Sequence, residues 1–245
     1  MPLSRSSLKI PSVSVITGSF AQAAVIDRIK STPDYHILML NKPAGFDFVA
    51  GQWVEIWPVD MPADEARIFS IASSPSEPYI ALLVKNGPSP YKQGLLALRP
   101  GDLVAVSEPR GGFSFRSDSP SVFVAAGMGV APFRSMIHAI LATHSMYPIR
   151  FFQISPSADA PFANEFAGFA EQENRFSYEL LAETNKRARL RSLIKHHAYQ
   201  SPRPDTVYYS AGPPEFITDL HALLTQQGID SEQFVTEAVT VPKVA

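Results

Sequence analysis

Residues 122–132, with the sequence VFVAAGMGVAP, combine an apolar run, two glycines and a proline in one short stretch. A short apolar run that ends at glycine is typical of a buried strand. Proline suits the first position of a helix, because its missing N–H would have no partner there. We therefore predict a buried strand, a tight turn at Gly127 and Gly129, and a helix in which Pro132 takes the first position.

The turn at Gly127 and Gly129 is also a candidate ligand site. Glycine lets a ligand approach the backbone closely, since no Cβ stands in the way. The following helix would offer free N–H groups to a pyrophosphate, and ligands of open α/β sheets bind at the carboxyl ends of the strands. The alternative is a tight turn that binds nothing, because this glycine pattern is a weak signal by itself.

A second stretch of the same design, YYSAGPP, occupies residues 208–214. An apolar run is again followed by a glycine, Gly212, and by prolines that can open a helix, Pro213 and Pro214. Two such turns at strand ends of one sheet would form a single crevice. Together the two stretches favour a bound ligand over an empty turn.

The chain from residue 120 onward alternates between strand-like and helical segments. The predicted strands are 122–126, 150–154, 176–181, 206–210 and 233–236, and the predicted helices are 132–146, 162–173, 188–198 and 214–227. Strand–helix alternation of this length implies right-handed crossovers and a parallel sheet with helices on both faces. We predict a five-stranded α/β domain over residues 120–245.

The earlier part of the chain has a different pattern. Strand-like runs lie within 23–40, 48–57, 67–73, 79–85 and 102–107, with one helical insert near 91–98. Short strands punctuated by glycine and proline suggest a small closed antiparallel barrel or a sandwich. We place this domain at residues 21–116, after an N-terminal tail at 1–20, with a polar linker at 116–120.

Composition excludes several classes of function. The net charge of −2 gives no indication of nucleic-acid binding. The absence of cysteine excludes disulfides, thiolate catalysis and cysteine-ligated zinc or iron–sulfur centres. No apolar run approaches the ~20 residues of a membrane span, and the first twenty residues lack a secretory signal, although an organelle transit peptide is an alternative to a plain tail. We predict a cytoplasmic, monomeric protein.

The segment Arg67-Ile68-Phe69-Ser70 has a specific chemical content. Alternation along a strand places Arg67 and Phe69 on one face and Ile68 and Ser70 on the other. A guanidinium beside an aromatic ring suits a ligand with both a flat ring and a phosphate. Taken alone, the segment is better explained by a barrel strand with a surface arginine and a core phenylalanine.

The segment Ser89-Pro90-Tyr91-Lys92 opens the predicted helical insert. Ser89 could cap the helix, its free N–H groups could bind a phosphate, and Lys92 adds a positive charge. The alternative is an ordinary capped helix.

The order of these segments resembles the ferredoxin–NADP reductase superfamily of FAD-dependent oxidoreductases. The resemblance spans residues 23 to 238, nearly the whole chain, and its strength lies in the number, order and spacing of the matching pieces. These are Gly51-Gln52, 67–73, 89–92, Pro100-Gly101-Asp102, 109–113, 127–132, 212–214 and Glu237.

The resemblance implies a Greek-key β-barrel that binds FAD and an α/β domain that binds NADPH or NADH. By this likeness the catalytic positions are Ser70, near flavin N5, together with Ala211 and Glu237. Arg67, Ser89, Tyr91 and Lys92 would hold the FAD pyrophosphate, while Ile68 and Phe69 would pack beside the flavin. Gly127, Met128, Gly129, Pro132, Gly212 and Pro213 would cradle the nicotinamide nucleotide.

Three positions depart from the family pattern. Ala211 stands where the family often has cysteine near the nicotinamide, and Met128 replaces a threonine of the first glycine turn. Glu237 is followed by Ala238 and Val239, where the family commonly has an aromatic residue that covers the flavin. The nicotinamide face of the flavin is therefore expected to be open.

The choice of nucleotide depends on residues 183–189. A 2′-phosphate would require Lys186, Arg187 or Arg189, whereas a free 2′-hydroxyl would accept a carboxylate such as Glu183. The positive charges favour NADPH, and the alternative for each residue is a solvated helix start.

We predict an NAD(P)H-dependent flavoprotein reductase that passes electrons to a protein acceptor such as ferredoxin, flavodoxin or an oxygenase component. Two alternatives stay open. One is a reductase of free flavin, and the other is a non-catalytic subunit that binds a nucleotide and a partner protein.

Overall fold

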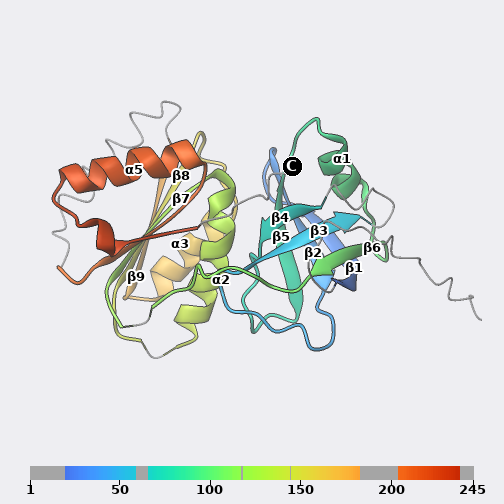
Figure 1. The fold of residues 1–245 in the computed structure, drawn as a ribbon, viewed down its shortest axis with the longest axis horizontal. Coiled ribbons are helices and arrows are strands. Elements are labelled where there is room, and N and C mark those ends of the chain that lie inside the picture. The colour runs from blue at the N-terminus through green and yellow to red at the C-terminus, as the bar shows by residue number, and fades with distance from the viewer. Residues whose placement is uncertain (1–19, 59–65, 117, 144, 183–203, 238–245) are drawn as a thin grey trace, which may run out of the picture.

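The computed structural model describes residues 20–58, 66–116, 118–143, 145–182 and 204–237. Two lobes lie side by side, an N-terminal lobe built mainly of strands and a C-terminal lobe in which helices cover a sheet (Figure 1). The predicted tail lies almost entirely outside the described residues. Within the described ranges, no helix is both long and apolar enough to cross a membrane.

The N-terminal lobe is a nearly closed antiparallel barrel, as the sequence predicted. Its strand order is β4-β3-β6-β1-β2-β5, and an isolated bridge between Ile71 and Leu82 joins the two outer strands. The elements are β1 (Phe20–Lys30), β2 (Tyr35–Asn41), β3 (Trp53–Pro58), β4 (Arg67–Ser70), β5 (Tyr79–Lys85), α1 (Pro90–Ala97) and β6 (Leu103–Ser107). Because β6 pairs with both β1 and β3, the connections are of the Greek-key type.

The barrel core follows from strict alternation along the strands. In β6, Val104 and Val106 are fully buried in the barrel core, whereas Ala105 packs outside it against Trp57. The same core receives Leu38 and Leu40 from β2. The interior of the described barrel is therefore filled with side chains.

The C-terminal lobe is a five-stranded parallel sheet, which confirms the predicted α/β domain. Its strand order is β11-β10-β7-β8-β9. The elements are β7 (Ser121–Ala126), η2 (Gly127–Gly129), α2 (Val130–Leu141), β8 (Ile149–Ser155), α3 (Ala163–Gln172), β9 (Phe176–Ala182), β10 (Val207–Ala211), α5 (Pro214–Gln226), η3 (Ser231–Gln233) and β11 (Phe234–Thr236). The helix predicted at 188–198 lies outside the described residues.

Helices cover both faces of this sheet, as alternation in β7 shows. Phe123 packs into a cluster with Phe133 of α2 and Phe166 of α3. Its neighbours Val122 and Val124 pack on the opposite face against Leu220 of α5. Figure 1 shows α2 on the side of the lobe that faces the barrel.

Three predicted boundaries were wrong. The helix predicted at 132–146 runs from Val130 to Leu141, so Pro132 is its third residue rather than its first. Proline is tolerated there because the first four N–H groups of a helix have no partner within the helix. The strand predicted at 48–57 begins only at Trp53, because Val49 and Gln52 are joined in a turn. The strand predicted at 67–73 ends at Ser70.

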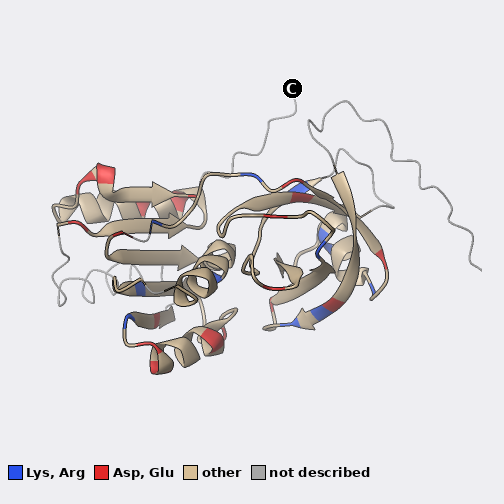
Figure 2. Ribbon diagram, turned by 90° about the horizontal axis from the view of Figure 1, so that it is seen from below, with Lys and Arg blue, Asp and Glu red and all other residues tan. Residues whose placement is uncertain are grey.

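The two lobes share a continuous buried interface. One hydrophobic cluster contains Tyr35 and Leu83 from the barrel together with Val130 and Phe133 from α2. Figure 2 shows the parallel strands of the C-terminal lobe running toward the barrel. The carboxyl ends of these strands therefore face the barrel rim, where a ligand of an open α/β sheet is expected.

Candidate functional site

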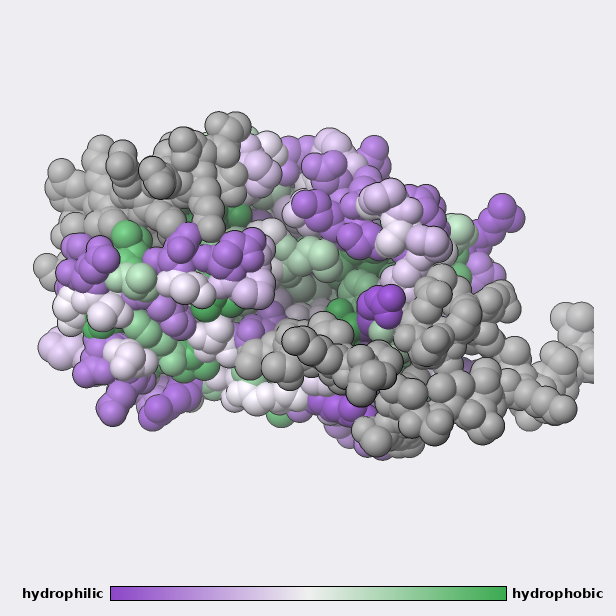
Figure 3. Space-filling view, turned by 45° about the horizontal axis from the view of Figure 1, so that its top comes forward, coloured by the Kyte–Doolittle hydropathy of each residue, from purple (hydrophilic) through white to green (hydrophobic). Residues whose placement is uncertain are grey.

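A cavity of about 360 Å³ lies between the lobes and is named here the junction cavity. Its walls on the C-terminal side are the two glycine turns, which follow β7 and β10, and Glu237 beyond β11. Its walls on the barrel side are Tyr35 of β2, the residues Ile68 to Ser70 of β4, and Lys85 of β5. Figure 3 shows apolar side chains gathered in a hollow between the lobes, with polar ones around them. These segments, which are far apart in the sequence, therefore lie around one cavity.

A second cavity of about 640 Å³ lies beside α1 and is named here the barrel cavity. Arg67 and the segment from Ser89 to Lys92 line it. Four further residues line both cavities, so the two cavities lie next to each other. The shared residues are Ile68, Phe69, Lys85 and Met128.

Arg67, Phe69 and Tyr91 form a ring-and-cation group in the barrel cavity. The guanidinium of Arg67 lies 5.4 Å from the centroid of the Tyr91 ring, and the Phe69 ring stacks at 6.3 Å from the same centroid. Tyr91 is fixed by its hydroxyl, which donates to the Ile56 carbonyl at 2.5 Å. Arg67 and Phe69 thus lie on the same side of β4, as alternation predicted.

The N-terminus of α1 has the features of an anion site. Ser89 is the N-cap, and its hydroxyl accepts a hydrogen bond from the Lys92 N–H at 3.4 Å. The first turn contains no acidic residue, so no side chain of that turn neutralises the partial positive charge of the helix end. Arg67, Lys85 and Lys92 bring three cationic side chains to the described lining of the barrel cavity, which includes no carboxylate. This end of the space suits a phosphate group.

The two glycine turns touch each other. A Cβ on Gly129 would lie 2.2 Å from the Ala211 carbonyl oxygen and 2.6 Å from the Gly212 nitrogen. Glycine is therefore required at position 129 for contact between the turns, and not only for approach of a ligand. Gly127 has a left-handed φ of 58°, and only the Tyr35 hydroxyl, at 3.7 Å, comes near its missing Cβ.

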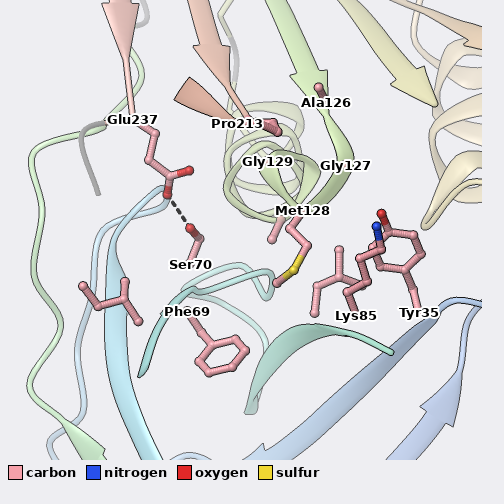
Figure 4. Close-up of a pocket in the computed structure, with 14 residues that line it drawn as sticks. Tyr35, Phe69, Ser70, Lys85, Ala126, Gly127, Met128, Gly129, Pro213 and Glu237 are labelled. Atoms are coloured by element: carbon pink, nitrogen blue, oxygen red, sulfur yellow. Dashed lines mark hydrogen bonds between the residues drawn. The ribbon is translucent and has the colours of Figure 1, made fainter. Parts of the chain in front are cut away.

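Ser70 and Glu237 meet across the junction cavity, as Figure 4 shows. The Ser70 hydroxyl donates a hydrogen bond to the Glu237 carboxylate. Burial raises the pKa of Glu237 to about 7, although the hydrogen bond from Ser70 opposes this rise. Because the Glu237 N–H also donates to the Ser210 carbonyl at 3.1 Å, the carboxyl group is held in place. The cavity thus contains a carboxyl group that exchanges its proton near neutral pH.

Sequence reasoning missed the two polar residues that β2 and β5 bring to the junction cavity, Tyr35 and Lys85. The ammonium of Lys85 lies 5.7 Å from the Tyr35 ring centroid, and the two residues are direct partners in the β2–β5 register. Burial, reinforced by the negative charge of Asp34, raises the pKa of the Tyr35 hydroxyl. The available signal was a lysine at the end of an otherwise apolar run, but only the strand pairing brings it to the cavity.

Met128 occupies the centre of the site. Its side chain extends from η2 between Ser70 on one side and Lys85 on the other (Figure 4). It lines both cavities and packs against the hydrophobic clusters of both lobes. Met128 therefore forms part of the wall between the two cavities.

Some predicted site residues do not line either cavity. Ala211 is 0% exposed and belongs to the core cluster, and Pro132 is also buried. Lys186 and Arg187 lie outside the described residues, as do Ala238 and Val239. The roles assigned to them stay predictions.

Sequence comparison finds relatives among flavoprotein reductases, although no protein-family model matches the chain. The chain is 27% identical over 230 residues to the reductase component of propane 2-monooxygenase from Gordonia sp. (strain TY-5), covering 86% of the chain and 65% of that protein. It is 23% identical over 246 residues to the toluate 1,2-dioxygenase electron transfer component of Pseudomonas putida, covering 94% and 71%. The chain thus spans about two thirds of the length of these relatives.

Solved structures share the fold. Ferredoxin-NADP+ reductase from Plasmodium falciparum superposes with a TM-score of 0.79 at 16% identity, covering 88% of this chain and 95% of that one. The ferredoxin NADP+ reductase from Neisseria gonorrhoeae with bound FAD and NADP gives 0.76 at 16% identity, covering 90% and 99%.

The fold, an antiparallel barrel followed by a parallel α/β sheet with a cavity between them, is the two-domain arrangement of these solved structures. The relatives and structural neighbours are ferredoxin–NADP reductase-like flavoprotein reductases, which confirms the resemblance predicted from the sequence.

Proposed function

We propose that this chain is an FAD-dependent reductase that takes a hydride from NADPH or NADH and delivers electrons to a separate acceptor. One observation carries the proposal. A phosphate-type site at Arg67 and Lys92 lies next to the crevice at the carboxyl ends of β7 and β10, and Ile68 and Phe69 line both. Residues 21–116 would form the FAD domain and residues 120–245 the nucleotide domain.

The residues present fit FAD. A volume of about 640 Å³ is within the range of roughly 300–1,000 Å³ typical of cofactor sites. Arg67, Lys92 and the free N–H groups of α1 would bind the pyrophosphate. Phe69 and Tyr91 would provide apolar surface for the rings. When bound, FAD would supply the redox chemistry, accepting the hydride and passing electrons on.

The junction cavity fits the nicotinamide end of a dinucleotide. The Gly127–Gly129 turn and the start of α2 would offer backbone N–H groups to its phosphates, and Lys85 would add a positive charge. The turn at Gly212 and Pro213 would hold the nicotinamide ring toward Ser70. Gly129 packs directly against the backbone of Ala211 and Gly212, and this contact keeps the two turns at a fixed separation.

Ser70 and Glu237 would bind and release a proton at the reaction site. With its pKa raised to about 7, Glu237 can hold or release a proton in the physiological range, and Ser70 Oγ would carry the exchange toward the flavin. No further acid–base group is needed for hydride transfer, because the cofactors supply that chemistry.

The decisive experiment is an anaerobic titration of FAD-loaded protein with NADPH and, separately, with NADH. Bleaching of the flavin absorbance by either nucleotide supports the proposal, and the ratio of the two apparent affinities identifies the nucleotide. We expect NADPH to be preferred because of Lys186 and Arg187. Absence of bleaching with both nucleotides would refute the reductase function and favour a non-catalytic subunit.

A reductase of free flavin is the second candidate function, because the barrel cavity lies next to the junction cavity and shares four lining residues with it. Retention of FAD through gel filtration separates the two, since a free-flavin reductase would elute without yellow colour. The acceptor class is proposed from the relatives' names, which point to oxygenase components. Stopped-flow reoxidation by a ferredoxin, a flavodoxin and an oxygenase component would rank these acceptors. We also propose a cytoplasmic, monomeric protein.

A further inference from the structure

Arg134 of α2 makes an unusually complete set of hydrogen bonds. Its side chain is 9% exposed. Nε and Nη2 donate to the two carboxylate oxygens of Glu165 at 2.8 Å each, while Nη1 and Nη2 donate to those of Glu77 at 3.0 and 3.1 Å. The remaining N–H of Nη1 donates to the Ala72 carbonyl at 2.9 Å. All five donors of the guanidinium are therefore satisfied.

The partners of Arg134 come from both lobes. Ala72 and Glu77 belong to the barrel, in the connection between β4 and β5, whereas Glu165 begins α3 of the C-terminal lobe. Glu77 is held further by the Tyr79 hydroxyl and by the Ser74 N–H, each at 2.5 Å. The arginine thus joins the barrel connection to two helices of the other lobe.

Both ends of this network lie close to the walls of the junction cavity. Ala72 follows Ser70 by two residues, and Arg134 lies one helical turn beyond Val130 and Ala131, where α2 begins. Because Gly127–Gly129 directly precedes α2, a displacement of Arg134 relative to Ala72 would move the glycine turn relative to Ser70. The separation of the two cavity walls therefore depends on these bonds.

The chemistry of the network favours a role in positioning the two lobes over a role in stability. The guanidinium helps to hold the pKa of Glu77 at about 2 despite its burial, so the carboxylate is charged at every physiological pH. Replacing a buried ion network by apolar groups of similar size is often neutral or even stabilising. Bidentate pairing, in contrast, fixes both distance and orientation.

We propose that Arg134 is a positioning residue, which fixes the nicotinamide-binding turn against the flavin-binding strand through Glu77 and the Ala72 carbonyl. The inference rests on the proposed function for its consequence in catalysis, but its geometric part holds for the protein without any cofactor. Without the network, the barrel would still bind FAD through Arg67 and Lys92, while the nucleotide would meet the flavin at a less defined distance.

The test compares two variants with a matched control. Arg134→Met removes the donors, and the triple variant Arg134→Met/Glu77→Gln/Glu165→Gln also removes the two buried charges that the single change would leave unpaired. The control is Arg175→Met, because Arg175 donates to four backbone carbonyls, all within the C-terminal lobe. It loses a similar number of bonds without disconnecting the lobes.

Two measurements separate positioning from stability. The first is the pair of dissociation constants for FAD and, on FAD-loaded protein, for oxidised nucleotide. The second is the distance distribution between spin labels at Gln22→Cys on β1 and Ala222→Cys on α5, both of which are exposed. The chain has no natural cysteine, so both labels are unique.

We expect the triple variant to melt near the wild-type temperature, with a broadened label distance, a nucleotide dissociation constant raised about tenfold or more, and an FAD constant changed less than about threefold. Arg175→Met should lower the melting temperature and leave both the distance and the nucleotide affinity unchanged. If the triple variant fails to fold, Arg134→Lys takes its place, since it keeps the positive charge but not the bidentate guanidinium. It should also raise the nucleotide dissociation constant more than the FAD constant, by a smaller factor.

A wild-type distance distribution in a folded Arg134 variant overturns the inference, whatever the cofactors do. Wild-type nucleotide affinity beside a broadened distance overturns its catalytic part. If the wild-type protein itself binds no nucleotide, the proposed function fails, and the distance measurement still decides the role of Arg134.

Discussion

Gly129 and Ala211 lie in contact across the two glycine turns, with 2.2 Å between the position a Gly129 Cβ would take and the Ala211 carbonyl oxygen. Real Cβ atoms do not approach a backbone oxygen this closely. Because both turns line the junction cavity, their contact sets the width of the crevice at the carboxyl ends of β7 and β10.

We predict that Gly129→Ala separates the two turns. Overpacking of a well-packed site lowers the free energy of unfolding by about 1–3 kcal/mol. In a chain of this size, each kcal/mol lowers the melting temperature by roughly 2–4 °C. Thermal melts and nucleotide binding to FAD-loaded protein check both consequences. Gly168→Ala is the control, because no atom outside the local helix backbone lies within 4 Å of the position that its Cβ would take. This change should stabilise α3 by about 0.5–1 kcal/mol. Unchanged melting of Gly129→Ala would contradict the prediction.

Much of the fold could be predicted from local patterns. The run 122–126 is apolar because a parallel strand is buried on both faces, and a glycine turn marks its end. Ser89 and Pro90 likewise announce the start of α1. These signals are local, so one sequence contains them completely.

The part that could not be predicted depends on long-range packing. Lys85 reaches the cavity only because β5 pairs with β2, and the contact of Gly129 with Ala211 requires β10 to lie beside β7. The same is true of Arg134, which reads as an ordinary polar position of an amphipathic helix until the barrel connection is placed against it. Pro132 misled the helix boundary, since proline fits any of the first helical positions.

We predict that the phosphate-type site holds FAD chiefly by charge. Arg67→Gln and Lys92→Gln should each weaken FAD binding by about ten- to a hundredfold, because a hydrogen bond to a charged group contributes on the order of 1.5–3 kcal/mol. Fluorescence titration of the apoprotein with FAD, FMN and riboflavin measures the effect. Riboflavin, which carries no phosphate, should bind the wild type and the variants alike, and an equal loss for all three ligands would contradict an electrostatic role.

Glu237 should make stability depend on pH. Its pKa rises from 4.5 to about 7 on folding because of burial, so the folded state binds the extra proton between these values. The stabilisation is complete below the unfolded pKa and is lost as pH rises through about 7. The difference is on the order of 2 kcal/mol after a discount for partial exposure. Urea unfolding at pH 4.5 and 8 should show this loss in the wild type and a smaller one in Glu237→Gln.

The same carboxyl group should control the rate of flavin reduction. An ionised Glu237 opposes the arrival of a hydride, so we expect reduction to slow as pH rises through about 7. Stopped-flow reduction by the preferred nucleotide should show one inflection there, absent in Glu237→Gln. Ser70→Ala removes the hydrogen bond that lowers the Glu237 pKa, and the inflection should move upward. An inflection that persists in Glu237→Gln would assign it to another group.

Lys85 should contribute to nucleotide binding more than to FAD binding. It lines both cavities and stands beside the Gly127 turn, and its register partner Tyr35 lies against the same turn. We expect Lys85→Met to raise the nucleotide dissociation constant about tenfold, equivalent to about 1.4 kcal/mol, and to reduce the dependence of binding on salt. Lys30→Met, at an exposed position of β1, is the matched control and should change neither. If Lys85→Met weakens FAD binding as much as nucleotide binding, the lysine serves the barrel cavity instead.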